Sequence, residues 1–115
     1  MTWISKAIDI TQYLKVDVKL TASETGSNTN KNLKYLKAFY RLNDGLEIPF
    51  STNSENGGNW GSASAEQNEL VGKKLQIIVR MANDYTSDKV ILDEVIVVAE
   101  EKPLEPINPG DILIS

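Results

Sequence analysis

The sequence predicts an all-β fold, a two-sheet antiparallel β-sandwich of the jelly-roll type. Residues 14–22 are apolar at every even position and polar at every odd one, the period of a strand with one buried face. Turn signals such as Asn43-Asp44-Gly45 separate several short segments of this kind, and no segment has a helical period. Short strands punctuated by turns are typical of sandwiches and jelly rolls.

The first half of the chain supplies a short strand, two long ones and a hairpin. Ile8 and Ile10 alternate with Asp9, and we expect Trp3 in the core beside this short strand. Strands follow over 14–22 and 33–42, separated by a stretch rich in Ser, Thr, Asn and Gly. After the Asn43-Asp44-Gly45 turn, apolar residues again occupy alternate positions, which predicts a hairpin: Leu46, Ile48 and Phe50.

The second half contains a loop and two more strands. The Ser/Asn/Gly-rich run 51–68 around Trp60 predicts a long ordered loop. Residues 75–81 alternate like a strand, whereas 89–99 are apolar on both faces, as expected for a strand that is central or covered. We therefore expect one domain over residues 1–100 and a Pro-containing linker or tail over 101–115.

Composition narrows the function. The 115 residues suffice for one core, and 41% apolar with 24% charged residues are ordinary values for a folded soluble protein. Without Cys or His, the chain lacks disulfides, a thiolate nucleophile, a His base and a Cys/His zinc site. A net charge of −4 argues against nucleic acid as a partner. No apolar run is long enough to insert into a membrane, and the start has no signal-peptide pattern.

The order of short motifs resembles a known group of domains. Trp-x-Ser with Ile-Asp-Ile opens the chain, Tyr-Leu-Lys-x-Phe-Tyr and Asn-Asp-Gly follow, and Leu-Gln-Ile-Ile-Val-Arg and Leu-Asp-Glu-Val-Ile-Val close it. From Trp3 to about Val98 this pattern resembles the jelly-roll accessory modules of secreted bacterial multidomain proteins, including carbohydrate-binding and cleaved-adhesin-like modules. The resemblance implies an extracellular or cell-surface module attached to an enzyme or adhesin.

The same resemblance suggests a structural calcium ion. In several related jelly rolls an acidic residue of the closing strand helps to hold calcium, and Asp93 matches that position. Calcium needs about six to eight oxygen ligands, and one Asp supplies at most two, so pairing of Asp93 with a Lys or with backbone amides is an equal alternative. The segment from Asp84 to Asp88 alternates oxygen groups like a calcium loop, but Lys89 stands where Gly is expected, which favours a plain turn.

A basic aromatic surface is the predicted binding site. Because the even apolar sets face the core, the opposite residues point outward, and they form one surface if their strands share a sheet: Lys15, Lys19, Tyr35, Lys37, Phe39, Arg41, Lys74, Gln76 and Arg80, with Asp17 as its acid. Tyr35 and Phe39 offer rings that stack on sugars. Lys37, Arg41 and Arg80 favour carboxylate or sulfate. The alternative is that Tyr35 and Phe39 are covered by another part of the protein. The basic residues would then be an ordinary solvated face that balances nearby acids.

Trp60 is a further candidate ligand residue. Gly57-Gly58-Asn59 precede it and Gly61 follows, so the ring either lies at a loop tip, where it stacks on a glycan, or folds back as a plug over one end of the sandwich. Tyr85 is a weaker candidate of the same kind.

Catalysis is not expected. Asp93 and Glu94 are adjacent on a strand and point to opposite faces, and no other carboxylate pair is singled out by the sequence. The leading hypothesis is a non-catalytic module for an anionic polysaccharide, uronate or sulfated. The alternative is an adhesive or structural module that packs against a neighbouring domain or protein.

Overall fold

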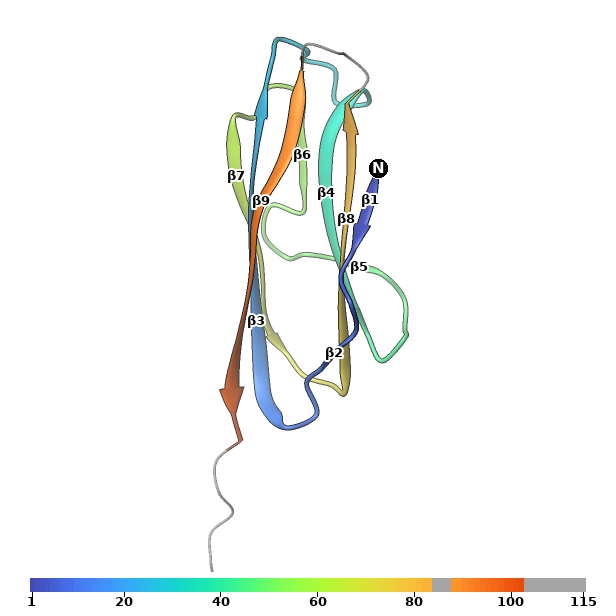
Figure 1. Ribbon diagram of the computed structural model, residues 1–115, viewed down its shortest axis with the longest axis vertical. Helices are drawn as coiled ribbons and strands as arrows, with labels where there is room; N and C mark the ends of the chain where they lie inside the picture. The colour runs from blue at the N-terminus through green and yellow to red at the C-terminus, as the bar shows by residue number, and fades with distance from the viewer. Residues whose placement is uncertain (84–87, 103–115) are drawn as a thin grey trace, which may run out of the picture.

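The computed structural model describes residues 1–83 and 88–102, and that part of the chain is all-β (Figure 1). Two antiparallel sheets lie face to face, which is consistent with the predicted sandwich. Among these residues no helix is long and apolar enough to cross a membrane.

The larger sheet is built around two long central strands. β8 (Lys74–Asn83) pairs with β4 (Lys34–Leu42) on one side, and with β1 (Thr2–Ile4) and β2 (Ile8–Asp9) on the other. The far edge of β4 pairs with two short strands, β5 (Ile48–Pro49) and β6 (Glu55–Gly57). Tyr35 therefore has Ala82 on one side and Gly57 on the other.

The smaller sheet has three strands in the order β7-β3-β9. β3 (Tyr13–Thr25) lies between β7 (Ser62–Leu70) and β9 (Lys89–Glu101). Its pairing with β9 is interrupted between Thr21 and Ala22, where β9 contains one extra residue, Asp93.

The core lies between the sheets and uses the faces that alternation predicts. Val16, Val18 and Leu20 on β3 are buried, and they belong to one cluster with residues of β4 and β8: Leu36, Ala38, Leu75, Ile77 and Val79. Strand periodicity therefore correctly assigned the inner and outer sides of the three longest predicted alternations. Two residues expected in the core are exceptions: Trp3, on the edge strand β1, is 37% exposed, and Leu14, near the start of β3, is 43% exposed.

The hairpin after β4 is confirmed only in part. Asn43 and Asp44 adopt positive φ (55° and 60°), and the Gly45 amide donates to the Leu42 carbonyl over 2.9 Å. The returning strand is short, since β5 contains two residues and Leu46 stays exposed.

The prediction of a long loop over residues 51–68 was wrong. Most of this segment forms β6 and β7, and β7 runs along the whole middle of β3. Two residues of β7 are buried in the core: Ala65, opposite Leu20, and Leu70, opposite Val16. Ser, Asn and Ala carry little strand propensity, so cross-strand pairing rather than local sequence decides the structure here.

The position predicted for the last strand was also wrong. Within residues 1–83 and 88–102, β9 pairs with β3 alone and is an edge strand, and its outward side chains Ile96 and Val98 are exposed. A strand that is apolar on both faces indicates burial only if a partner covers it. Residues 103–115, most of the predicted linker, lie outside the described residues.

A buried ion cluster joins the two sheets at one end. The ammonium group of Lys34 is 0% exposed and lies 3.0 Å from Asp88 Oδ2 and 3.3 Å from Glu24 Oε1. Burial by itself would raise the pKa of Asp88, but the amides of Asn28 and Ser27 and the ammonium of Lys34 outweigh burial and hold it below its ordinary value. Gly26 is required here, because a β-carbon at this position would overlap the Asp88 carboxylate.

Candidate functional site

The predicted surface divides between the two sheets. Tyr35, Lys37, Phe39 and Arg41 alternate along β4, and Arg80 on β8 pairs with Lys37, so these five residues do share one outer face. Lys15 and Lys19 belong to β3 in the other sheet. The condition that all the basic strands share a sheet therefore does not hold, and the candidate surface contains only the β4 and β8 residues.

One half of this face is occupied by an internal ion cluster, which we call the Glu47 cluster. Glu47, from the loop between β4 and β5, accepts two bonds from the Arg80 guanidinium at 2.6 and 2.8 Å and lies 3.5 Å from Arg41 Nη2. The Arg80 guanidinium also covers the Phe39 ring, 5.2 Å from its centroid. The bonds from Arg80 hold the pKa of Glu47 below its ordinary value despite partial burial.

The consequence is that the cations of the Glu47 cluster already have an anionic partner. A bidentate arginine–carboxylate pair satisfies the donors that would otherwise bind a ligand carboxylate. Ile78, which pairs with Phe39 on the same outer face, is fully buried. Phe39, Arg41 and Arg80 are thus side by side, and we call this half of the face closed because both arginines already face Glu47.

The other half of the face opens into a hollow of about 510 Å³, the Tyr35–Trp60 hollow. It is lined by residues of β4, β6 and the two loops that precede β4 and follow β6: Lys31, Asn32, Tyr35, Lys37, Glu55, Asn56, Gly57 and Trp60. Three of the predicted ligand residues, Tyr35, Lys37 and Trp60, therefore meet at one concave site.

Glycines allow the hollow to form. The loop 28–32 lies close against β6, and a β-carbon at Gly57 would come within 3.0 Å of the Lys31 side chain. Gly58 has φ +71°, and a β-carbon there would lie 2.7 Å from the Thr29 carbonyl oxygen. The amides of Asn30 and Asn32 donate to the side-chain oxygens of Asn28 and Asn30, which orders the loop that carries Lys31.

Trp60 lies between the core and the Tyr35–Trp60 hollow. Its half-buried ring packs against the core cluster and also lines the Tyr35–Trp60 hollow. The preceding turn is held by the buried Lys34, whose ammonium donates to Asn59 Oδ1 at 3.0 Å and whose carbonyl accepts from the Gly58 amide at 2.9 Å. The ion cluster thus fixes the segment that carries Trp60.

The charge of the Tyr35–Trp60 hollow is basic on balance. Lys31 and Lys37 line it together with the single acid Glu55. The Lys37 ammonium lies 4.8 Å from the centroid of the Tyr35 ring. Within residues 1–83 and 88–102, neither lysine forms an ion pair, so both ammonium groups can meet a ligand anion.

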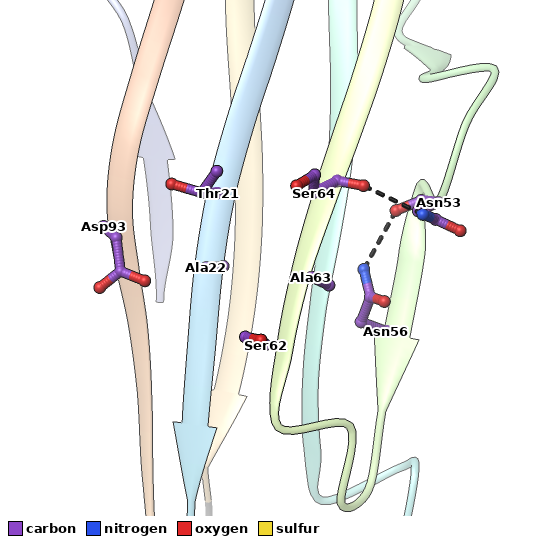
Figure 2. A pocket seen from close by; sticks show the side chains of 8 residues that line it. All are labelled: Thr21, Ala22, Asn53, Asn56, Ser62, Ala63, Ser64 and Asp93. Atoms are coloured by element: carbon purple, nitrogen blue, oxygen red, sulfur yellow. Dashed lines mark hydrogen bonds between the residues drawn. The ribbon is translucent and has the colours of Figure 1, made fainter.

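A second hollow, of about 540 Å³, lies around the edge of β7 (Figure 2). Its lining is polar and comes from β3, β7, β9 and the segment around β6: Thr21, Ala22, Asn53, Asn56, Ser62, Ala63, Ser64 and Asp93. Asn56 lines both hollows, and its amide donates to the Asn53 carbonyl at 3.0 Å. Figure 2 shows that Asn53 in turn donates to the Ser64 carbonyl.

Asp93, the residue proposed for calcium, lies on this second hollow. Its carboxylate accepts a hydrogen bond from the Ser23 hydroxyl at 3.5 Å, and Figure 2 shows it across β3 and β7 from Asn53 and Asn56. Among the described residues, no group of three or more acidic residues is placed to hold a metal ion. Calcium at Asp93 stays a prediction. Residues 84–87 of the other calcium-like segment, with Tyr85, lie outside the described residues.

Several residues at the site were not predicted from the sequence. Lys31, Asn32, Glu55 and Asn56 come to the Tyr35–Trp60 hollow from segments without strand periodicity, and Glu47 comes from a turn. The pair Gly57-Gly58 was the available signal, since adjacent glycines permit close backbone approach. Comparisons with protein-family models, with curated proteins and with solved structures found no match for this chain.

Proposed function

We propose that this chain is a non-catalytic carbohydrate-binding module, with a jelly-roll fold, that belongs to a secreted multidomain protein and binds an anionic polysaccharide. The observation that carries the proposal is the Tyr35–Trp60 hollow, where two aromatic rings and two lysines without an ion-pair partner among the described residues line one concave surface.

The chemistry of such a hollow suits an acidic sugar. Aromatic faces stack on the C–H faces of pyranose rings, and Asn32 and Asn56 can exchange hydrogen bonds with hydroxyl groups. Lys31 and Lys37 would meet a carboxylate or a sulfate. A hollow of about 510 Å³ has the size of small-molecule sites in general and suits one or two sugar rings.

Affinity electrophoresis tests the proposal. The chain is run through gels that contain a neutral, a uronate or a sulfated polysaccharide, each with calcium and with a chelator. We expect selective retardation in the uronate or sulfated gel. Loss of retardation in chelator, reproduced by Asp93→Asn, would support calcium.

Matched variants localise the site. Lys31→Gln, Lys37→Gln and Tyr35→Ala should each reduce retardation, while Lys6→Gln removes the same charge from an exposed position outside the hollow and should not. Equal losses in Lys31→Gln and Lys6→Gln would indicate a general charge effect and would contradict a site in the hollow. No retardation in any gel would overturn the proposal.

The second candidate function is an adhesive or structural module. It is favoured by the apolar edge of β9, where Ile96, Val97 and Val98 are exposed in succession. This surface lies on the smaller sheet, whereas the Tyr35–Trp60 hollow is built by the larger one, so the two functions are separable by mutation.

A further inference from the structure

The free edge of β9 is a long unpartnered feature of the described residues. β9 is 13 residues long and pairs with β3 along one side. No other backbone hydrogen bond of β9 occurs within residues 1–83 and 88–102. A row of N–H and C=O groups with this exposure is a template for another strand.

The usual protections of an edge strand are missing from one stretch of β9, between Glu94 and Glu100. Natural edges carry charges, prolines or bulges, but residues 95–99 (Val-Ile-Val-Val-Ala) have neither charge nor proline, and the bulge at Asp93 precedes them. Ile96, Val97 and Val98 are 40%, 37% and 59% exposed. Exposed apolar side chains in a row on a free edge mark an interaction surface.

The core itself is open on this side. Val97 shares the inner face with its β3 partner Val18, and Trp3 shares it with Val79, yet both Val97 and Trp3 are 37% exposed. Met1 and Ile91 line one mainly apolar hollow of about 400 Å³, so the edges of β1 and β9 lie on the same side of the molecule. A strand added to β9 would cover inward-facing apolar groups as well as backbone.

We propose that two copies of this chain pair through β9, antiparallel and edge to edge, about a two-fold axis at Val98. In this register Val98 lies opposite Val98 of the other copy, Val97 opposite Ala99, and Ile96 opposite Glu100. The faces agree, because Val97 and Ala99 are both inward in the register with β3.

Charge complementarity supports a second copy as the occupant. The same register places Glu94 of each copy opposite Lys102 of the other, so an opposite-charge pair lies at both ends of the paired segment, beyond Val95 and Ile96, which face Glu101 and Glu100. Moving the axis by one residue, to Val97, would instead place Glu94 opposite Glu100. Of these two registers, the one centred on Val98 is self-complementary in charge, as an isologous interface requires.

Sedimentation velocity of the full 115-residue chain over a range of concentrations tests the proposal. We expect a monomer–dimer equilibrium. Val98→Lys should weaken dimerisation severalfold or more, because it places two like charges directly opposite each other at the two-fold axis, while Val71→Lys, the same change at a residue that is 65% exposed outside β9, should leave it unchanged. Circular dichroism melting of each variant separates loss of pairing from loss of folding.

A charge swap tests the register without apolar changes. Lys102→Glu places two like-charged pairs in the interface and should weaken the dimer severalfold, and the double variant Glu94→Lys/Lys102→Glu should restore it. A monomer at every concentration, or a dimer insensitive to Val98→Lys, overturns the β9 interface. Failure of the double variant to restore the dimer overturns the Val98 register. Neither result bears on glycan retardation, which depends on the other sheet.

Discussion

The two halves of the outer β4–β8 face both combine an aromatic ring with basic side chains. They differ in whether those basic side chains already face a carboxylate of the same chain. In the Glu47 cluster an arginine lies over Phe39 and is bound by a carboxylate at 2.6 Å. In the Tyr35–Trp60 hollow a lysine lies over Tyr35, and neither lysine of the hollow forms an ion pair within the described residues. One loop residue, Glu47, therefore makes the difference between a closed surface and an open one.

The comparison shows why a basic strand face is a weak indicator of an anion site. Alternation correctly identifies which cations point outward, but an acid from a remote loop can satisfy them. The burial of Lys34 makes the same point from the inside, because two carboxylates from different segments stabilise a cation where periodicity alone would place an apolar residue.

The largest effect on stability is expected from Lys34→Met. This change removes the buried cation that holds the segment carrying Trp60, in the open half of the face. Glu24 and Asp88 would be left buried without their cation, and Asn59 would lose its donor. We expect the melting temperature to fall by roughly 10 °C or more. Lys31→Met is the matched control at an exposed lysine and should shift the melting temperature little; similar shifts in the two variants would contradict a structural role for Lys34.

Acid should weaken the fold through two carboxylates, Asp88 in the buried ion cluster and Glu47 on the outer face. Asp88 and Glu47 have folded pKa values below their ordinary values of 3.8 and 4.5, so their contribution is complete above those values and is lost as the pH falls through the lower folded values. Denaturant unfolding should give a constant free energy near neutral pH and a decline below about pH 4.5. In Glu47→Gln that decline should be shallower, and an unchanged profile would argue against the contribution of Glu47.

Glu47→Gln should also convert the closed half into an open one. Arg41 and Arg80 would lose their carboxylate, at an expected cost of about 1 kcal/mol in the free energy of unfolding, measured by urea titration. Retardation in uronate or sulfated gels should increase, because two cations become available beside the hollow. Reduced retardation would mean that Glu47 helps to bind the glycan.

The smallest effect is expected from Arg41→Gln in the chain with Glu47 intact. Since Arg41 already faces Glu47 at 3.5 Å, its loss should reduce gel retardation less than Lys37→Gln, which removes the same charge from the same strand. Equal or greater loss in Arg41→Gln would transfer the binding site to the Glu47 cluster.

The sequence by itself determined the strands whose side chains alternate and the faces they bury. Val16, Val18 and Leu20 on one strand and Leu36 and Ala38 on another are inside because a period of two leaves an amphipathic strand one way to face a core. Tyr35 and Lys37 followed as outward residues of the same pattern.

Only the tertiary structure decided which strands share a sheet, which edge stays free and which cations stay unpaired. β7 is a strand because β3 lies beside it, and β9 is an edge because nothing in the described residues covers it. Lys31 and Trp60 reach Tyr35 through loops that glycines allow to approach, and Glu47 reaches Arg80 through a turn. These outcomes depend on contacts between segments far apart in the chain, and local periodicity carries no information about such contacts.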